Sequence, residues 1–273
     1  MSTEPWSIDE LICTCIARQV EDGDILTQGI ATPLVAAGYL LAWHAHASDI
    51  YFASAIGQTI CRSGAPLGLA HVESLWLEQA MVSVGFVQAA ADLLPRVKPK
   101  EFFRPGQVDQ LGNFNNIAFG KDYSHPRMRM PGTGGIPDVT VYMDDIYLYV
   151  PRHSRVTFVQ ELDFLSGLGH QPTRRRGAGP KYLITNLGAF DFQNGKMRLV
   201  SVHPGISVER VMAKTGFEIE ISTPVEITEL PTHDDIRLLR ETIDPLGIRK
   251  LEFMSGHNRR AALREILLTE TPQ

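Results

Sequence analysis

Residues 25–54 place the strongest constraint on the fold of this 273-residue chain. A short apolar run, "ILTQG", leads into "TPLVAAGYLLAWHA", where Thr32 is a candidate N-cap and Pro33 takes the first helical position. The run "DIYFAS", typical of a strand, follows. A strand, a helix and a strand in this order predict a βαβ unit, which has a right-handed crossover and parallel strands covered by helices.

Elements of both kinds continue on either side of this unit. Before it, "SIDELICTCIARQV" has apolar residues at helical spacing, and Ser7 with Glu10 forms a capping box. After it, we expect an apolar helix near "VGFVQAAADLL", a strand around "GQVDQ" and a strand at "IYLYV". The polar stretch 170–181 is expected to be a long loop that connects two halves of the sheet.

The C-terminal third has a different pattern. The runs "KYLITNLGAFDF" and "KMRLVSVH" flank Asn194-Gly195, a pair typical of hairpin turns, and a helix is predicted from Ser207 to a stop at Gly216. We therefore predict a single α/β domain over residues 1–273. Its sheet is open and mostly parallel, with helices on both faces and a C-terminal antiparallel hairpin and helix.

Composition and charge exclude several classes of function. The net charge of -5 leaves no general basic field for nucleic acid or an anionic membrane surface. The chain begins with the acidic, polar "MSTEPWSIDE" and has no apolar run of about 18 residues, so neither a secretion signal nor a membrane span is expected. Its three cysteines, Cys13, Cys15 and Cys61, have no metal-binding spacing. These features predict a cytoplasmic protein with core thiols and no bound metal.

A glycine loop, "PGTGGIPD", is the first candidate for a functional site. It lacks the lysine of a phosphate-binding P-loop, and Pro137 stands where the dinucleotide fingerprint needs its third glycine. Gly132, Gly134 and Gly135 nevertheless let backbone amides approach a ligand, because no Cβ shields them. Two interpretations stay open: a donor loop for an oxyanion, or a tight turn without a ligand.

Polar side chains are dense on the N-terminal side of this loop. Asn113 and Asn116 are candidates for orienting a substrate, although asparagine also satisfies the backbone of tight turns. Arg127 and Arg129 alternate along an extended stretch, so both could face a substrate carboxylate or acidic partners in the protein. His125 is a candidate acid or base, with a structural role as the alternative.

Two further clusters have competing interpretations. Arg174 to Arg176 could hold an anionic ligand, but a solvated basic loop is the simpler interpretation. His44 and His46 lie two residues apart near a helix end and face different directions, which argues against a metal site.

At "GQVDQLGNFNN" and "HPRMRMPGTGGIPD" the sequence resembles the β chain of class I coenzyme A transferases, most closely the glutaconate type. The resemblance extends to "VTFVQELDFLSGLGH", "YLITNLGAFDF" and "HPGISVERVMAKTGF", and "LTQGIATPLVAA" resembles the family's N-terminal glycine loop, which includes Gly29. It implies a coenzyme A transferase-like fold shared by two related subunits, and an acyl-CoA site at their interface. The expected assembly is a heterodimer or its α2β2 dimer.

The family's nucleophile is a glutamate on the second strand of the β chain, and here that stretch reads "YFASAIGQ". Ala53 or Ala55 takes the glutamate's place, and residues 50–63 contain no carboxylate. An alanine methyl group cannot attack a thioester, so transfer through an acyl-enzyme cannot proceed at this residue. A replacement from Asp49, Glu73 or Glu78 would need a different backbone path.

Without this glutamate, the sequence resembles the B chain of one branch of the family, the ring-cleaving coenzyme A hydrolases of bacterial steroid catabolism. The implied reaction opens the last steroid ring, a cyclic β-keto thioester, by adding water across a carbon–carbon bond. Such a cleavage needs a base and oxyanion donors but no acyl-enzyme. The resemblance assigns the base to a glutamate of the A-type subunit, so no catalytic residue is expected in this chain. A coenzyme A transferase β subunit and a non-catalytic acyl-CoA-binding chain are the alternatives.

The expected site of this chain therefore consists of binding groups, and acyl-CoA is its substrate, with no cofactor. The residues expected to bind substrate or an oxyanion are Gly29, Asn113, Asn116, Arg127, Gly132, Gly134 and Gly135.

Overall fold

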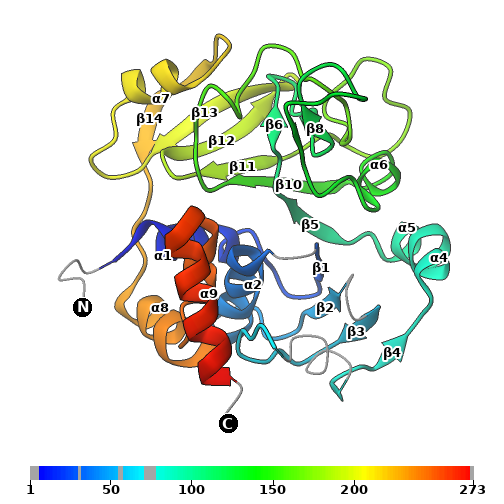
Figure 1. The fold of residues 1–273 in the computed structure, drawn as a ribbon, viewed down its shortest axis with the longest axis vertical. Helices are drawn as coiled ribbons and strands as arrows, with labels where there is room; N and C mark the ends of the chain where they lie inside the picture. Colours follow the sequence, from blue (N-terminus) through cyan, green and yellow to red (C-terminus); the bar gives the residue numbers. More distant parts are fainter. Residues whose placement is uncertain (1–5, 30–31, 55–57, 71–77, 271–273) are drawn as a thin grey trace. The chain divides into compact units, whose positions relative to one another are not determined.

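The computed structural model describes residues 6–29, 32–54, 58–70 and 78–270. The chain forms two compact units (Figure 1). The first contains the residues up to Phe86 together with those from Leu230 onward, and the second runs from Val87 to Glu229. The single domain expected over residues 1–273 stays a prediction.

The first unit contains the predicted βαβ arrangement. Its helical segments are α1 (Ile8–Ala17), α2 (Pro33–Ala45), α8 (His233–Arg237), the π-helix η2 (Leu238–Ile243), the 3-10 helix η3 (Ile248–Glu252) and α9 (Gly256–Glu270). Its strands are β1 (Ile25–Gln28), β2 (Tyr51–Ser54), β3 (Thr59–Cys61) and β4 (Val82–Ser83). Strands β1 and β2, joined through α2, pair in parallel, whereas β2 with β3 and β3 with β4 pair antiparallel. The parallel pairing confirms the crossover.

Helices α1 and α2 begin where the sequence predicts. The Ser7 amide donates to Glu10 Oε2 over 2.8 Å, as a capping box requires, and Thr32 precedes Pro33 at the start of α2. The helices pack closely at Gly38, where an added Cβ would lie 2.6 Å from Ile16 Cγ2. Cys13, Cys15 and Cys61 are buried and none is in a disulfide, as expected for core thiols.

The second unit contains a mixed sheet in the order β14-β13-β12-β11-β10-β5 (Figure 1). Its strands are β5 (Lys100–Phe103), β10 (Asp145–Val150), β11 (Tyr182–Thr185), β12 (Gly188–Gln193), β13 (Lys196–Val202) and β14 (Glu220–Ile227). Strands β5, β10 and β11 are mutually parallel, β11, β12 and β13 are antiparallel, and β13 and β14 are parallel. The predicted C-terminal hairpin is confirmed, because β12 and β13 join through Asn194 and Gly195, both with positive φ.

Short elements surround this sheet. Two small pairs are formed by β6 (Gln107–Val108) with β7 (Phe114–Asn115), and by β8 (Ala118–Phe119) with β9 (Met128–Arg129). The helical segments are α4 (Phe86–Gln88), the π-helix η1 (Ala89–Leu93), α5 (Leu94–Val97), α6 (Ile136–Val139) and α7 (Val208–Lys214). The apolar helix expected near residue 86 is thus three successive segments, and the strand expected around Gln107 has only two residues.

Apolar side chains of the long strands form the core of the second unit. Its members include Phe103, Val108, Phe114, Leu148, Phe158, Leu183, Phe190 and Leu199. Ser207 caps α7 by accepting from the Arg210 amide, as predicted, but α7 ends at Lys214, two residues before Gly216. At Gly216 an added Cβ would lie 2.3 Å from the carbonyl oxygen of Phe158, so this glycine is required for packing.

None of the helices in the described ranges is long and apolar enough to cross a membrane.

Candidate functional site

The glycine loop, Pro131–Gly135, lies in the second unit between β9 and α6. Gly132 has φ of +105° and Gly134 has φ of +50°, values that L side chains rarely adopt. Gly135 is the N-cap of α6 with φ of -86°, so its backbone does not require glycine. An added Cβ at any of the three would meet no atom within 4 Å. The loop therefore borders open space, and close packing does not explain its glycines.

The four amides of this loop, those of Gly132, Thr133, Gly134 and Gly135, differ in availability. The Gly132 amide donates to the Asn116 carbonyl over 3.1 Å, and the Thr133 carbonyl accepts from the Ile136 amide over 2.9 Å. Among the residues that the structure describes, the amides of Thr133, Gly134 and Gly135 have no acceptor. The loop thus has three amides free to bind an anion, two of them on glycines, and Gly132 is engaged internally.

Asn116 lies beside the loop and is held by three hydrogen bonds. Its carbonyl holds Gly132, its Oδ1 accepts from the Gly106 amide over 2.8 Å, and its own amide donates to Ser166 Oγ over 2.9 Å. Asn116 is therefore connected to the loop through its backbone. Ser166, buried at 3% exposure, was not predicted from the sequence.

Asn113 lies in a separate turn and is fully hydrogen-bonded. Its Nδ2 donates to Asp109 Oδ2 over 2.9 Å, and its Oδ1 accepts from the Gly169 amide and from Gln171 Nε2. These bonds link the Asn113 side chain to the segment 169–171, whereas the amides of its own turn, at Leu111 and Asn113, donate to Asp109 Oδ1. Substrate binding by Asn113 stays a prediction.

The arginines beside the loop are exposed. The Arg127 guanidinium lies 5.8 Å from the centre of the Phe119 ring and has no carboxylate partner within the described ranges. Arg129 stacks on Tyr123 at 4.3 Å and donates to its carbonyl. Arg127 is therefore the cation next to the loop that is available to an anionic ligand. His125 is exposed and lies 3.4 Å from Asp122.

Gly29 belongs to the first unit. It follows β1, and its carbonyl accepts from Thr32 Oγ1 over 3.2 Å. Its role as a ligand-binding glycine stays a prediction.

The position of the missing nucleophile also lies in the first unit. Ala53 lies in β2, 7% exposed, between Thr27 of β1 and Ile60 of β3. Ala55, the other candidate position, and Glu73 lie outside the described residues. Strands β1 to β4 contain no carboxylate, and Asp49 forms an ion pair with Arg62.

The buried carboxylates of the first unit are all engaged in structural contacts. Arg249, 1% exposed, donates to Asp9 Oδ2 at 2.8 Å, Asp244 Oδ2 at 2.8 Å and Glu10 Oε1 at 3.1 Å. Although burial favours the neutral acid, hydrogen bonds from Arg240 and Ser7 hold the pKa of Glu10 below its ordinary value. Glu252, the fourth, accepts from the Leu34 amide over 3.0 Å. None of the four is a free nucleophile.

Two buried histidines of the second unit were not predicted from the sequence. The ring of His153 stacks on Phe158 at 3.7 Å, and its Nε2 lies 3.0 Å from Thr215 Oγ1. Burial lowers the pKa of His153 to about 3 and lowers the pKa of His203. Both rings are therefore neutral near pH 7, and their contacts are structural.

The three arginines at 174–176 divide into two groups. Arg174 donates to the carbonyls of Leu168, Gly169 and Arg176, so it stabilises its own loop. Arg175 and Arg176 are exposed, as a solvated basic loop requires.

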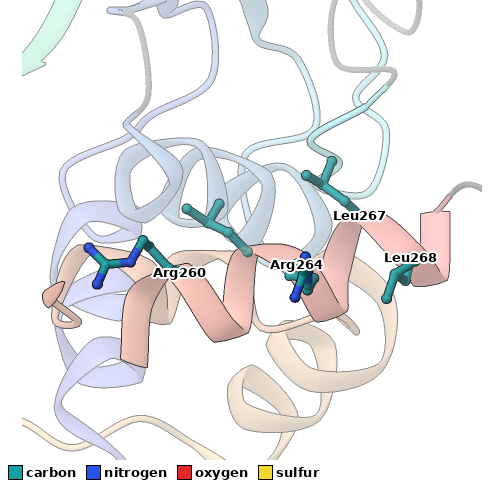
Figure 2. A pocket seen from close by; sticks show the side chains of 5 residues that line it. Arg260, Arg264, Leu267 and Leu268 are labelled. Carbon is teal, nitrogen blue, oxygen red and sulfur yellow. The ribbon is translucent and has the colours of Figure 1, made fainter. Parts of the chain in front are cut away.

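A separate surface feature lies on α9. A hollow of about 610 Å³ is lined there by Arg260, Leu263, Arg264, Leu267 and Leu268 (Figure 2). It contains none of the predicted site residues. Within the described ranges, no group of three or more His, Cys, Asp or Glu side chains could hold a metal ion.

Comparison with known proteins connects these features to one family. Residues 102–214, which include the glycine loop, match the family model described as Coenzyme A transferase. The B-type subunit of glutaconate CoA-transferase from Acidaminococcus fermentans is 29% identical over 256 residues, which cover 86% of this chain and 92% of that protein. The IpdB subunit of the cholesterol ring-cleaving hydrolase from Mycobacterium tuberculosis is 35% identical over 156 residues, 55% of this chain and 62% of that protein.

The fold agrees with this assignment. The crystal structure of the decarboxylase AibA/AibB superposes with a TM-score of 0.77 at 27% identity, covering 89% of this chain and 97% of that chain. The three similar proteins are thus a transferase, a hydrolase and a decarboxylase by name. By sequence over residues 102–214 and by fold over most of its length, the chain is similar to coenzyme A transferases, and it is a homologue of the B-type subunit of glutaconate CoA-transferase and of the IpdB subunit.

Proposed function

We propose that this chain is the B-type subunit of a heteromeric enzyme that acts on coenzyme A thioesters. Its reaction is the hydrolytic opening of the last steroid ring, a cyclic β-keto thioester, during steroid degradation. Homology to two B-type subunits supports the assembly, and homology to a cholesterol ring-cleaving hydrolase supports the reaction.

The observation that carries this proposal is that the described residues of β1 to β4 offer no carboxylate at the family's nucleophile position. Ala53 occupies the strand where the family's glutamate is expected, and strands β1 to β4 have no carboxylate. The four buried carboxylates of the first unit are held by arginine side chains or by a backbone amide. Transfer through an acyl-enzyme needs a free carboxylate, whereas addition of water across a carbon–carbon bond does not.

The glycine loop supplies the electrostatic part of this chemistry. As water adds to the ring ketone, its oxygen becomes negative, and the ring bond then breaks to leave an enolate that takes up a proton. The amides of Gly134 and Gly135 stabilise one of these oxyanions, and Arg127 binds a carboxylate of the substrate. Removing one such donor typically costs about 3 to 4 kcal/mol of transition-state stabilisation.

The partner subunit completes the site. A glutamate of an A-type subunit is the base that activates water, and the assembly is an α2β2 heterotetramer. Coenzyme A is part of the substrate, so the reaction needs no cofactor and no metal. Gly29 of the first unit contributes to the binding of the substrate.

The test is reconstitution with an A-type subunit and incubation with a cyclic β-keto thioester in H2(18)O. We expect one labelled carboxylate in a ring-opened product that retains coenzyme A, and no covalent adduct on this chain by intact-protein mass spectrometry. Movement of coenzyme A to an added acid, together with an adduct on this chain, would instead establish a transferase.

Two further outcomes would also reject the proposal. Release of CO2 without ring opening would indicate a decarboxylase, the chemistry named for one structural homologue. Binding of the thioester without turnover would indicate a non-catalytic acyl-CoA-binding chain. Measuring product, acceptor thioester, CO2 and bound thioester in one incubation separates these cases.

A further inference from the structure

The glycine loop has little internal structure of its own. Its N-terminal side is held by the bond from the Gly132 amide to Asn116, and its C-terminal side continues into α6, which is a single turn. Gly134 and Gly135, which present the free amides, lie between these two points. Their positions therefore depend on the groups that hold Asn116 and α6.

A serine hydroxyl holds the Asn116 side. Ser166 Oγ accepts from the Asn116 amide over 2.9 Å and donates to the Phe114 carbonyl over 3.1 Å. Because Ser166 is buried, removing its hydroxyl would leave these two hydrogen bonds unmade, and water would not readily replace them. Loss of this hydroxyl would leave the Asn116 amide without its acceptor.

A threonine hydroxyl holds the α6 side. Thr140 Oγ1 donates to the Ile136 carbonyl over 2.7 Å and accepts from the Leu168 amide over 3.1 Å. Thr140 is 0% exposed, and Ile136 directly follows Gly135. This hydroxyl thus ties the first residue of α6 to the segment that contains Ser166.

The segment 166–168 is itself rigidly placed. Phe114 and Gly167 exchange backbone hydrogen bonds of 2.9 Å in both directions. An added Cβ at Gly167 would lie 2.2 Å from the Phe114 ring, so only glycine allows this approach. Both sides of the glycine loop are therefore hydrogen-bonded, through Asn116 and Thr140, to the same rigid segment, 166–168.

We propose that Ser166 and Thr140 are positioning residues that set the amides of Gly134 and Gly135 for the reaction. They touch no reacting atom and act through Asn116 and α6. The use of these amides as oxyanion donors rests on the proposed function, whereas the mechanical coupling of the two hydroxyls to the loop does not.

The coupling is tested first by hydrogen exchange on the assembled enzyme. Ser166→Ala and Thr140→Val should each increase amide exchange in residues 130–139 by about tenfold or more, because one bond that restrains the loop is lost. Thr140→Ser keeps the hydroxyl and should restore exchange to the wild-type rate. Ser154→Ala, which removes a half-buried hydroxyl bonded to Thr157 elsewhere in the unit, is the matched control and should leave this segment unchanged.

The catalytic consequence is tested by kinetics on whichever thioester reaction the wild-type complex performs. Ser166→Ala and Thr140→Val should lower kcat by about 10- to 100-fold, because small displacements of catalytic groups are costly, and should change KM by less than about threefold. Thr140→Ser should recover most of kcat. Rates are corrected for the folded fraction measured by thermal melting, so that unfolding is not counted as lost catalysis.

The outcomes separate this inference from the proposed function. Unchanged exchange in Ser166→Ala and Thr140→Val overturns the coupling, whatever the reaction is. Increased exchange with unchanged kcat overturns the catalytic use of the loop. If the complex transfers coenzyme A instead of opening a ring, the proposed function fails, and the same variants still decide the positioning roles.

Discussion

The two units of this chain bury different kinds of polar groups. The first buries Asp9, Glu10, Asp244, Arg249 and Glu252, most of them in one ionic cluster. The buried polar groups described in the second unit include no carboxylate, and are mainly hydroxyl, amide and imidazole groups. The first unit thus has many buried charges that are already paired, whereas the second has few buried charges and a glycine loop with free backbone amides.

This difference follows from how each unit is built. The first unit is assembled from both ends of the chain. Arg249 bonds to Asp9, which lies 240 positions away in the sequence. Its charges hold these ends together. The second unit is continuous, and its neutral hydrogen bonds hold loops in place. The contrast supports the proposal that this chain contributes backbone donors and that a partner protein contributes the carboxylate.

The largest effect should come from breaking the ionic cluster. Arg249→Met leaves Asp9 and Asp244 buried without their arginine partner, whereas Glu10 keeps its bonds to Arg240. We expect the free energy of unfolding to fall by about 3 to 5 kcal/mol, the usual cost of removing one partner from a buried ion pair. Chemical denaturation measures this change.

The matched control for the cluster is Arg259→Met, which removes an exposed arginine of α9. It should change the free energy of unfolding by less than about 0.5 kcal/mol. If the two variants are equally stable, the cluster does not hold the first unit together.

The second-largest effect should come from displacing the free amides of the glycine loop. Gly134→Val places a β-branched side chain at a φ of +50°, so the loop must change conformation even though a Cβ has space there. We expect kcat to fall about 100-fold or more with the subunits still assembled, as measured by steady-state kinetics and size-exclusion chromatography.

Gly205→Val provides the comparison for Gly134→Val. Gly205 has a φ of +79° and open space at its Cβ, but it lies in another turn of the second unit. It should carry similar backbone strain and leave kcat within about twofold. Equal loss of kcat in both variants would show that strain, and not the glycine loop, is responsible.

The smallest effect concerns the neutral core of the second unit under acid. The pKa of His153 is about 3 in the folded state and about 6.5 when unfolded, so below about pH 6.5 only the unfolded state binds the proton. Its contribution to stability is complete above this range and is lost as the pH falls toward 3.

Between about pH 7 and about pH 5 the wild type should lose about 2 kcal/mol more unfolding free energy than His153→Gln. Urea denaturation at the two pH values measures this difference. Identical pH dependence in the two proteins would mean that the pKa of His153 is the same in the folded and unfolded states, so the prediction would be wrong.

Local patterns predicted where several helices begin and where the hairpin turns. The N-caps Ser7, Thr32 and Ser207 and the Asn194-Gly195 turn lie where the sequence placed them, because capping and turn chemistry involve residues only a few positions apart. Strands β3, β4, β5, β7, β8, β9 and β14 were not predicted, and neither were the helices α8 and α9. Most of these strands are short, and their pairing depends on strands distant in the sequence.

The candidate site was predicted less completely. The glycine loop and the loss of the glutamate were evident in the sequence, but the availability of each amide was not. Gly132 and Gly134 look alike in the sequence, and only the acceptor offered by Asn116 separates them. Ser166 and Thr140 belong to no recognisable motif, because each acts through a hydrogen bond to a residue distant in the sequence. Ser166 bonds to Asn116, 50 positions away, and Thr140 to Leu168, 28 positions away.

The sequence alone therefore determined the α/β class, the crossover at residues 25–54, the glycine loop and the alanine at position 53, since each depends on residue identity or on spacing within a few turns. Tertiary structure alone decided that the first unit's buried carboxylates are held, that Asn113 is bonded to the segment 169–171, and that the Gly134 and Gly135 amides stay free while the Gly132 amide does not. The physical reason is that burial and hydrogen-bond saturation are set by neighbours distant in the chain, which no local pattern specifies.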